Sequence, residues 1–330
     1  MAESVFKENL FEGKKVFITG GTGSFGQAFL NFILTNYKPK KVIIYSRDEL
    51  KQFNLKNNEV VLKSKIPIRF LLGDVRDSSR LDFAISDKPD VVVHAAALKQ
   101  VDTAEYNPTE FINTNIMGAQ NVISACLKNN IKKVLALSTD KASSPVNLYG
   151  STKLLSDKLF VAANTYSKNT KLSVVRYGNV SFSRGSILPK LIEQAKKNKF
   201  DITHSGMTRF CISLNDSVKF VDYCYKKMQG GEIFVPKLKS YKILDLVKAI
   251  NPKAKINYIG IRPGEKMHEE MISETDSKNT SEYKNCYVIN PYFIKTKNKA
   301  KKIDNGYKSN KNQFLKIDEI KNLIKKFKEK

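Results

Sequence analysis

Tyr149 and Lys153 stand four residues apart, a spacing that places two side chains on the same face of a helix. A lysine beside a tyrosine favours the phenolate, so we expect the pKa of Tyr149 to be lowered. A partly ionised tyrosine can take the proton of a hydroxyl group while a hydride leaves the same carbon. With the hydroxyl groups of Ser138 and Thr139 nearby, the pair predicts the oxidation of an alcohol.

Asp140 and Lys141 add an acid and an amine directly after Thr139. The oxidation of an alcohol needs only the tyrosine, the lysine and a hydroxyl group. An additional carboxyl–amine pair therefore suggests further proton transfers on the same substrate. The alternative is a salt bridge that faces solvent, and the spacing by itself leaves both interpretations open.

A glycine-rich turn lies near the N-terminus, in the pattern Gly20-x-x-Gly23-x-x-Gly26. It follows an expected strand and opens an expected helix, which is the context that a dinucleotide-binding turn requires. Glycine allows the tight turn and the close approach of a pyrophosphate, whose charge lies at the helix N-terminus. The predicted contacts in this turn are Gly20, Thr22, Gly23, Ser24, Phe25 and Gly26.

The end of the second expected strand distinguishes between two nicotinamide cofactors. An acidic residue at this place binds the ribose 2′-hydroxyl of NAD, whereas this chain has Ser46-Arg47-Asp48. The guanidinium of Arg47 can pair with the 2′-phosphate of NADP, which we favour, although Asp48 leaves NAD open. The other predicted cofactor contacts are Lys51, Asp74, Val75, Ala95, Ala97, Lys99, Tyr149 and Lys153. The alanines either let the chain pass close to the cofactor or simply pack tightly.

Short apolar runs alternate with helical segments through the first half of the chain. Parallel strands need crossovers, which are usually helices, so the alternation predicts an α/β fold with a doubly wound, parallel Rossmann-type sheet. The expected strands are 15–19, 41–45, 68–72, 91–95, 133–138 and 171–176, and the expected helices are 24–35, 113–129 and 149–167.

The alternation ends near Gly178, after which a smaller C-terminal substrate lobe is expected. We predict an NADP-binding domain over 12–178 and a substrate-binding lobe over 179–277, with the strand-like segment 231–236 returning to the main sheet. Residues 278–330 form a lysine-rich extension that we expect to be weakly structured until a final helix. The apolar side of that helix carries Ile317, Ile320, Leu323, Ile324 and Phe327.

Lysine accounts for a net charge of +25, and it is densest after Asn290. Such a charge can mark a nucleic-acid-binding protein. Here lysine is spread along the chain without an aromatic-interleaved basic motif, so we expect no nucleic-acid partner. No apolar run reaches the roughly 18–20 residues of a membrane span, and the N-terminus lacks a signal-peptide pattern. The four cysteines have no metal-binding or disulfide spacing, which favours the reducing cytoplasm and no metal site.

Eight segments together resemble the inverting UDP-N-acetylglucosamine 4,6-dehydratases, which are extended short-chain dehydrogenase/reductases that begin pseudaminic acid biosynthesis. The resemblance covers most of the chain, from Lys14 to Ile272, and its motifs are specific. The segments are GGTGSFG (20–26), YSRDELK (45–51), GDVRD (73–77), HAAALKQV (94–101), AEYNP (104–108), STDKASSPVNLYGSTK (138–153), RYGNV (176–180) and IRPGEKMH (261–268).

The resemblance implies a reaction in which the cofactor is reduced and then restored. Tyr149 would remove the C4 hydroxyl proton while hydride passes from C4 to NADP. Lys141 would abstract the acidified C5 proton and Asp140 would protonate the departing C6 hydroxyl. Hydride would return to C6, and C5 would be reprotonated from the opposite face. This role of Lys141 requires a pKa well below the ordinary value of about 10.4, which burial beside Lys153 or the nicotinamide would provide.

The substrate implied by the resemblance is UDP-N-acetylglucosamine, and the product is its 4-keto-6-deoxy derivative inverted at C5. The implied contacts to the sugar and the diphosphate are Lys99, Asn179, Arg209, Arg262 and Glu265. Relatives of this family are commonly homo-oligomers. His94 is expected to be a packed core residue without a catalytic role.

The combination of Asp140-Lys141 with Tyr149 also separates this class from its relatives. Retaining dTDP-glucose dehydratases carry Asp-Glu at the dyad, and UDP-galactose 4-epimerases carry small residues there. Retaining UDP-N-acetylglucosamine dehydratases usually have methionine at the position of Tyr149. The alternatives that stay open are a nucleotide-sugar epimerase, a C5-retaining dehydratase, and a cofactor-binding regulatory or nucleic-acid-binding protein that keeps the fold.

Overall fold

A large sheet forms the centre of the molecule. The computed structural model describes residues 10–181, 186–293 and 301–328, and within them this sheet has ten strands in the order β16-β14-β15-β10-β6-β5-β4-β1-β2-β3. The strands from β10 to β3 are all parallel. Their bounds are β1 Lys15–Thr19, β2 Lys41–Ser46, β3 Ile68–Leu72, β4 Val91–His94, β5 Lys133–Thr139, β6 Lys171–Tyr177 and β10 Ile233–Pro236.

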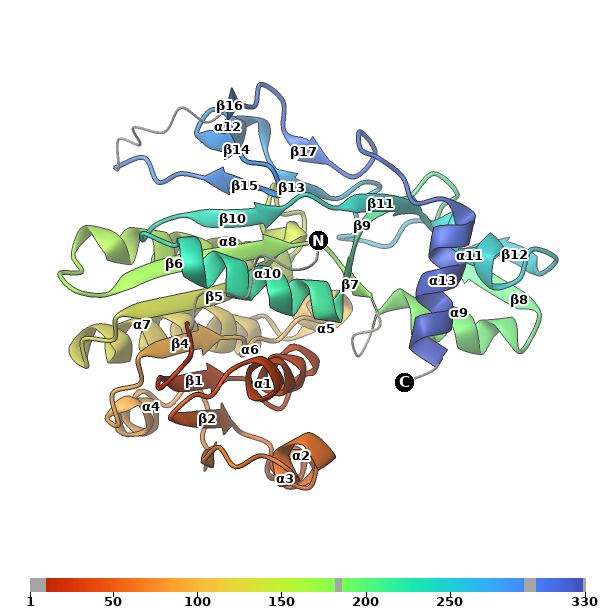
Figure 1. The fold of residues 1–330 in the computed structure, drawn as a ribbon. Coiled ribbons are helices and arrows are strands. Elements are labelled where there is room, and N and C mark those ends of the chain that lie inside the picture. The colour runs from red at the N-terminus through yellow and green to blue at the C-terminus, as the bar shows by residue number, and fades with distance from the viewer. Residues whose placement is uncertain (1–9, 182–185, 294–300, 329–330) are drawn as a thin grey trace.

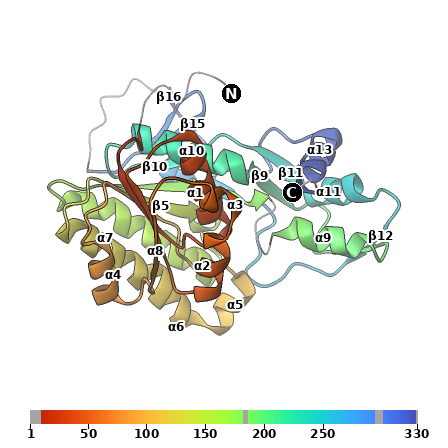
Figure 2. The ribbon, with the colours of Figure 1, turned by 60° about the horizontal axis from the view of Figure 1, so that its bottom comes forward.

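Helices cover both faces of this sheet (Figures 1 and 2). On one face, α1 (Ser24–Asn36) and α10 (Leu214–Lys227) pack on a hydrophobic cluster beneath them. On the other face, a second cluster lies under α4 (Ser78–Ile85), α7 (Gly118–Lys128) and α8 (Leu148–Ala162). Because strands buried on both faces must be apolar almost throughout, the short apolar runs of the sequence form these strands. The predicted doubly wound α/β fold is confirmed.

The strand order reverses between β1 and β4, which have their crossovers on opposite faces of the sheet. In an open parallel sheet, ligands bind in the crevice that such a reversal leaves at the carboxyl ends of the strands. The helix predicted over 113–129 lies beside this crevice and begins as a π-helix, Ile112–Met117, before it continues as α7. The short helices in the first half of the chain are α2 Glu49–Lys56, α3 Glu59–Leu62, α5 Val101–Tyr106 and α6 Pro108–Phe111.

A smaller lobe lies beyond the carboxyl ends of the parallel strands (Figure 1). Its own hydrophobic cluster is formed by α9 (Ile187–Ala195), α11 (Ile243–Ile250), α13 (Ile317–Lys328) and the strand pair β8–β12. Ile320 and Ile324 of α13 are buried in it, as predicted, whereas the side chain of Phe327 is outside the described residues. The remaining strands of this region are β7 Val180–Ser181, β8 Lys199–Ile202, β9 Thr208–Ser213, β11 Lys239–Lys242 and β12 Lys255–Tyr258.

The C-terminal extension also adds strands to the main sheet. β15 (Cys286–Ile289) pairs antiparallel with β10, and β14 (Thr280–Glu282) and β16 (Lys301–Lys302) follow it outward. The expectation of weak structure after Lys278 is wrong for these segments, because β15 covers an edge of β10 that would otherwise be unpaired. The other short elements here are β13 Glu270–Ile272, α12 Glu274–Ser277 and β17 Tyr307–Lys308.

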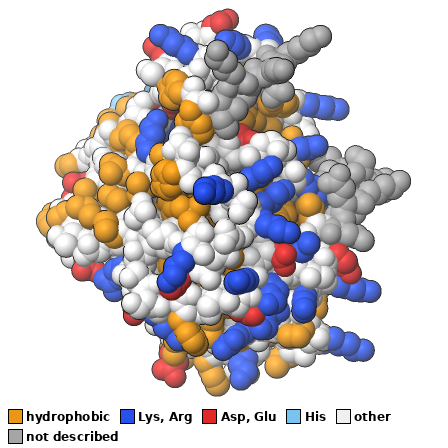
Figure 3. Space-filling model, turned by 90° about the vertical axis from the view of Figure 1, so that its left-hand side faces the viewer, with side chains coloured by type: hydrophobic (Ala, Val, Ile, Leu, Met, Phe, Trp, Pro, Cys, Tyr) orange, Lys and Arg blue, Asp and Glu red, His pale blue; other side chains and the backbone are white. Residues whose placement is uncertain are grey.

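Lysines gather at the end of the molecule where the parallel strands begin. Lys15, Lys41, Lys133 and Lys171 are the first residues of β1, β2, β5 and β6. Figure 3 shows Lys and Arg side chains over one half of the face on this side. Asp87 forms ion pairs with Lys15 (2.7 Å) and Lys41 (2.8 Å), and these two lysines lower the pKa of its carboxyl. Among the described helices, none is both long and apolar enough to cross a membrane.

Candidate active site

The glycine turn connects β1 to α1 at the crevice. Gly20 has a φ of +64°, and a Cβ atom there would lie 2.7 Å from the backbone nitrogen of Ala96. A Cβ on Gly26 would lie 2.5 Å from Gly21 Cα, so the helix can approach the strand only with glycine at this position. Gly23 is the N-cap of α1 without a side-chain hydrogen bond, and the first turn contains no acidic residue. The turn therefore presents backbone N–H groups and the positive end of the helix dipole to an anion.

The three residues at the end of β2 make different contacts. The Asp48 carboxylate caps α2, where it accepts from Lys51 N at 2.9 Å. The guanidinium of Arg47 is half-exposed and lies 3.6 Å from Asp74, whose carboxylate is also bound by Arg76. Ser46 is buried. Arg47 and Asp48 both lie at the crevice, but the Asp48 carboxylate is already engaged at the N-terminus of α2.

A cavity of about 930 Å³ extends from the glycine turn to the smaller lobe. It brings together every residue predicted to contact the cofactor or the substrate. Those residues are Gly20, Thr22, Gly23, Ser24, Phe25, Gly26, Ser46, Arg47, Asp48, Lys51, Asp74, Val75, Ala95, Ala97, Lys99, Tyr149, Lys153, Asn179, Arg209, Arg262 and Glu265. Thr139 and Lys141 also line it, whereas Asp140 lies beneath the wall and is fully buried.

Tyr149 and Lys153 lie on the first turns of α8, which begins after the N-cap Asn147. Both side chains are buried. The Lys153 ammonium donates to the carbonyl oxygen of Leu137 at 2.7 Å. Burial raises the pKa of Tyr149 to about 12, and the opposing effects of Lys141 and the hydrogen-bonded Thr139 do not outweigh it. The prediction that Lys153 lowers this pKa is therefore wrong, because desolvation of the phenolate dominates.

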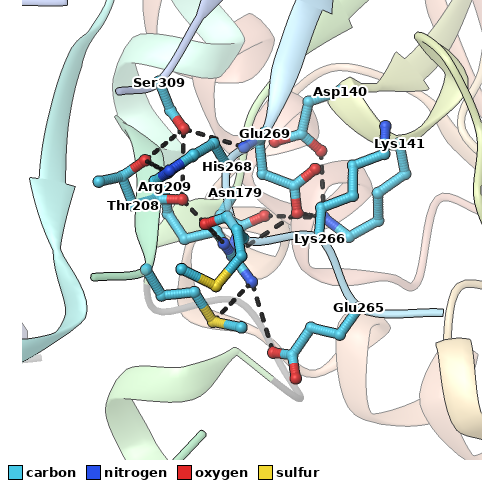
Figure 4. Close-up of polar contacts among 12 residues, drawn as sticks. Asp140, Lys141, Asn179, Thr208, Arg209, Glu265, Lys266, His268, Glu269 and Ser309 are labelled. Carbon is cyan, nitrogen blue, oxygen red and sulfur yellow. Dashed lines mark hydrogen bonds and ion pairs between the residues drawn. The ribbon is translucent and has the colours of Figure 1, made fainter. Parts of the chain in front are cut away.

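Asp140 and Lys141 form a short 3₁₀ turn with Ala142 at the carboxyl end of β5. Three acceptors surround the Lys141 Nζ atom: Asp140 Oδ1 at 3.1 Å, Asn179 Oδ1 at 3.1 Å and Glu269 Oε1 at 3.3 Å. The carboxyl of Asp140 is fully buried, so the interpretation as a salt bridge that faces solvent is wrong. We call these residues together with Arg209 the Lys141 cluster (Figure 4).

The charges within the Lys141 cluster change the expected pKa values. Burial raises the pKa of Asp140, which favours the protonated carboxyl. For Lys141, burial favours the neutral amine, but the carboxylates of Asp140 and Glu269 outweigh it and raise the pKa above its ordinary value. The prediction of a lowered pKa for Lys141 is therefore wrong for this structure. Its neighbours are two carboxylates rather than the cationic Lys153.

Glu269 is the member of the cluster that the sequence analysis missed. It is buried, and its Oε1 atom lies 3.5 Å from Arg209 Nε as well as near Lys141. It follows directly on the motif that contains Arg262 and Glu265, but a second glutamate in that stretch has no spacing that singles it out. Only the approach of its loop to the end of β5 brings it to Lys141.

The predicted substrate contacts differ in burial. Arg209 is buried and donates to the carbonyl oxygen of Thr208 at 2.8 Å, and it lies 3.4 Å from Glu265. Arg262 is exposed and pairs with Asp102 of α5 at 3.5 Å. Burial lowers the pKa of Lys99. Three cationic side chains, of which Arg209 is buried and Arg262 is exposed, thus line one cavity, a combination that suits a phosphate-containing ligand.

The histidines and cysteines do not contribute to this site. His94 is buried, and its Nδ1 atom shares a hydrogen bond of 2.8 Å with Thr19 Oγ1. Its ring stacks on Phe160, so the prediction of a core histidine is confirmed. Burial lowers its pKa to about 3. The four cysteines are free thiols. Within the described residues, no group of three or more His, Cys, Asp or Glu side chains is arranged to hold a metal ion.

The chain is similar to several known proteins. A family model described as polysaccharide biosynthesis protein matches residues 16–291. A UDP-N-acetylglucosamine 4,6-dehydratase (inverting) from Campylobacter jejuni subsp. jejuni serotype O:23/36 (strain 81-176) is 56% identical over 287 residues, which are 86% of this chain and 84% of that protein. A UDP-glucose 4-epimerase from Rickettsia canadensis (strain McKiel) is 42% identical over 334 residues, 96% of each chain. The X-ray structure of Pen from Bacillus thuringiensis has a TM-score of 0.89 at 36% identity, and the match covers 96% of this chain and 99% of that one.

The family model, over residues 16–291, spans the parallel strands of the Rossmann-type sheet and most of the smaller lobe. The segments that carry the glycine turn, the dyad Asp140-Lys141 and the pair Tyr149/Lys153 all lie within the residues that the family model matches. The chain belongs to the family of the inverting UDP-N-acetylglucosamine 4,6-dehydratases, within the extended short-chain dehydrogenase/reductases.

Proposed function

We propose that this chain catalyses the NADP-dependent dehydration of UDP-N-acetylglucosamine to UDP-2-acetamido-2,6-dideoxy-β-L-arabino-hex-4-ulose, the first step of pseudaminic acid biosynthesis. The observation that carries the proposal is the burial of Asp140 against Lys141 at the wall of the cavity that also contains Tyr149. If the enzyme only oxidised an alcohol, the acid Asp140 and the base Lys141 would have no function in the reaction.

The glycine turn fits a nicotinamide dinucleotide because a Cβ atom at Gly20 would collide with the backbone and α1 has no side-chain cap. Arg47 faces the crevice, whereas the Asp48 carboxylate already caps α2. These contacts favour a 2′-phosphate over a free ribose hydroxyl, and hence NADP over NAD. A bound nicotinamide would supply a hydride acceptor that is restored within each turnover.

The residues of the chain would share the proton transfers as follows. Tyr149 would take the proton of the C4 hydroxyl as phenolate, a form that burial disfavours unless a cation such as a bound nicotinamide ring lies beside it. Asp140, whose raised pKa favours the acid form, gives its proton to the departing C6 hydroxyl, which leaves as water. Lys141 takes the C5 proton after it has passed one of its own protons to Asp140, 3.1 Å away. A proton returned to C5 from the opposite face completes the inversion.

The cationic residues of the cavity would bind the diphosphate. Arg209 is held by the carbonyl oxygens of Thr208 and Met267, whereas Arg262 and Lys99 line the cavity from the loop before Glu269 and from the segment after β4. Asn179 and Glu265 would contact the sugar. We further propose that the protein works in the cytoplasm as a homo-oligomer, without a nucleic-acid partner.

Incubation of the purified protein with UDP-N-acetylglucosamine and NADP, followed by NMR, tests the proposal. The expected product is the 4-keto-6-deoxy sugar with inverted C5, and in deuterium oxide the label should enter at C5. Stoichiometric reduced cofactor should not accumulate. Unchanged substrate, or a ketone that retains the C5 configuration, would contradict the specific reaction.

The second candidate is a nucleotide-sugar 4-epimerase, which the similarity to the Rickettsia protein favours. An epimerase returns hydride to C4 and has no leaving group at C6, so it needs neither a protonated Asp140 nor a base at C5. A product that keeps its 6-hydroxyl group and exchanges no C5 hydrogen would decide for epimerisation.

A further inference from the structure

Glu269 stands at the Lys141 cluster with no role in the reaction described above. Its carboxylate is buried, and its Oε1 atom lies between two cations, 3.3 Å from Lys141 Nζ and 3.5 Å from Arg209 Nε. The second oxygen, Oε2, is buried and has no hydrogen-bond partner among the described residues. Burial of an imperfectly paired carboxylate costs stability, so its presence points to a task in the site rather than in folding.

The backbone of Glu269 is fixed by the C-terminal extension. Glu269 N donates to Ser309 Oγ at 2.9 Å, and Ser309 N donates to the Glu269 carbonyl oxygen at 2.8 Å. The Ser309 hydroxyl also lies 2.7 Å from Thr208 Oγ1, next to Arg209 in the sequence. The segment around Ser309 therefore holds the glutamate in register with the arginine, as Figure 4 shows.

Glu269 is one of three hydrogen-bond acceptors that hold the Lys141 side-chain nitrogen in place. An ammonium group has three hydrogens, and Asp140, Asn179 and Glu269 provide one acceptor oxygen for each. When one proton passes to Asp140, the neutral amine keeps two hydrogens, which Asn179 and Glu269 can still accept. These two acceptors hold the nitrogen at the cavity wall whether the amine is charged or neutral.

We propose that Glu269 is a positioning residue that holds the Lys141 amine at the cavity wall and, by its negative charge, makes both members of the dyad bind their protons more tightly. This inference rests on the proposed dehydration. Its physical basis is that a fixed negative charge opposes the loss of a proton from any neighbouring group. Asp140 is thereby kept as an acid for the C6 hydroxyl, and Lys141 becomes a stronger acceptor for the C5 proton.

Other ionisable groups face the same cluster and set the background for this effect. Within the cluster they are Asp140, at the end of β5, and Arg209 of β9. Outside it they are Tyr149 of α8, Tyr241 of β11 and Lys266 in the loop before Glu269. Arg209 and Lys266 are cations and partly offset the charge of Glu269. Both are hydrogen-bond donors and cannot accept from the Lys141 ammonium, which leaves Glu269 as its charged acceptor outside the dyad among the described residues.

The pH dependence of dehydration follows from counting protons on the dyad. Asp140 and Lys141 can together hold two dissociable protons. The active form of the pair holds one of them. The fully protonated pair and the fully deprotonated pair are both inactive. Activity therefore falls on the acid side when the pair gains a proton and on the basic side when it loses one, and both values belong to the pair. Removal of the Glu269 charge should move both limbs of the profile to lower pH, by about one to three units.

The experiment compares pH–rate profiles of the full-length wild type, Glu269→Gln and Glu269→Asp at saturating UDP-N-acetylglucosamine and NADP. The Gln variant keeps the shape and loses the charge, so both limbs should shift to lower pH. The Asp variant keeps the charge further from Nζ and should shift them in the same direction by less. Glu270→Gln is the matched control, because Glu270 contacts Ser144 and Lys308, and its profile should coincide with the wild type.

The outcomes separate the two proposals. A wild type that leaves UDP-N-acetylglucosamine unchanged overturns the proposed dehydration. A wild type that forms the product while both Glu269 variants keep the wild-type limbs overturns only the inference about Glu269. If Glu269→Gln does not fold, as judged by circular dichroism, Glu269→Asp decides by the same criterion. A lower rate with unshifted limbs would assign Glu269 to structure alone.

Discussion

The glycine turn and the Lys141 cluster lie in one cavity but are built in different ways. At the turn, the segment Gly20–Gly26 leads into the N-terminus of α1, and the absence of side chains at its glycines is what makes the site. In the cluster, charged side chains converge from the end of β5, from β9 and from the loop before β13. The first site depends on local backbone conformation, and the second depends on how distant segments pack.

The two sites also differ in the desolvation free energy that they cost the folded protein. A backbone anion site needs no charged residue, so it adds little buried charge to the fold. The Lys141 cluster buries two carboxylates and Arg209 and partly buries Lys141, and this desolvation is offset only while all partners stay in place. Changes in the cluster should therefore alter chemistry at preserved cofactor binding, and changes in the turn should do the reverse.

The largest effect is expected from Lys141→Met, which keeps the volume and removes the base. Dehydration should fall by about 10²–10⁴-fold, and deuterium exchange at C5 should be lost to a similar extent. NADP affinity, measured by calorimetry, should stay within a few-fold of the wild type. Lys308→Met, at a lysine that pairs with Glu270, is the matched control and should keep full activity. Normal C5 exchange in the Lys141 variant would show that the base lies elsewhere.

The turn is tested by Gly20→Ala against Gly13→Ala. Both glycines have a φ of +64°, but only at Gly20 would a Cβ atom meet the backbone of Ala96, whereas nothing lies within 4 Å of a Cβ at Gly13. Gly20→Ala should reduce the free energy of unfolding by about 1–3 kcal/mol more than Gly13→Ala, and it should also abolish measurable NADP binding. Equal unfolding midpoints in urea for the two variants would argue against the close approach.

Arg47→Ala tests whether the charge of Arg47 contributes to NADP binding. Loss of a charge-assisted contact to a 2′-phosphate should weaken NADP binding by about ten- to a hundredfold and leave NAD binding nearly unchanged. Arg80→Ala is the control, since Arg80 does not line the cavity, donates to the carbonyl oxygen of Leu72 and lies over the Phe83 ring. If the two cofactors lose affinity equally in the Arg47 variant, the preference for NADP does not arise from this guanidinium.

The smallest effect is expected far from both sites, at Asp87. Lys15 and Lys41 depress the pKa of its carboxyl in the folded state, so its stabilising contribution is present above the unfolded pKa of about 3.9 and is lost as the pH falls through the folded value. Asp87→Asn should therefore lower the free energy of unfolding at pH 7 by about 0.2–1 kcal/mol, with a smaller difference near pH 3. Urea titrations at the two pH values measure this. Activity and NADP affinity should not change, and a loss of either would mean that the two sites are sensitive to the opposite end of the sheet.

Local patterns in the sequence were sufficient for the parallel sheet and the glycine turn. The runs at 15–19, 41–45 and 133–138 became β1, β2 and β5 because buried parallel strands are apolar throughout. The strands after Lys278 were missed because they are two to four residues long and form only by pairing with β10, with β13 or with one another. Their stability comes from an edge that is distant in sequence.

The sequence by itself predicted the residues of the glycine turn that line the cavity, since strand, turn and helix follow one another along the chain. It also placed Asp140, Lys141, Tyr149 and Lys153 near one sheet edge. Their protonation was decided by the tertiary structure: burial raises the pKa of Tyr149, and Glu269 lies beside Lys141 where a cation was expected. Desolvation and Coulomb interactions depend on neighbours within a few ångströms, and one of those neighbours, Glu269, comes from a segment more than a hundred residues away in the chain.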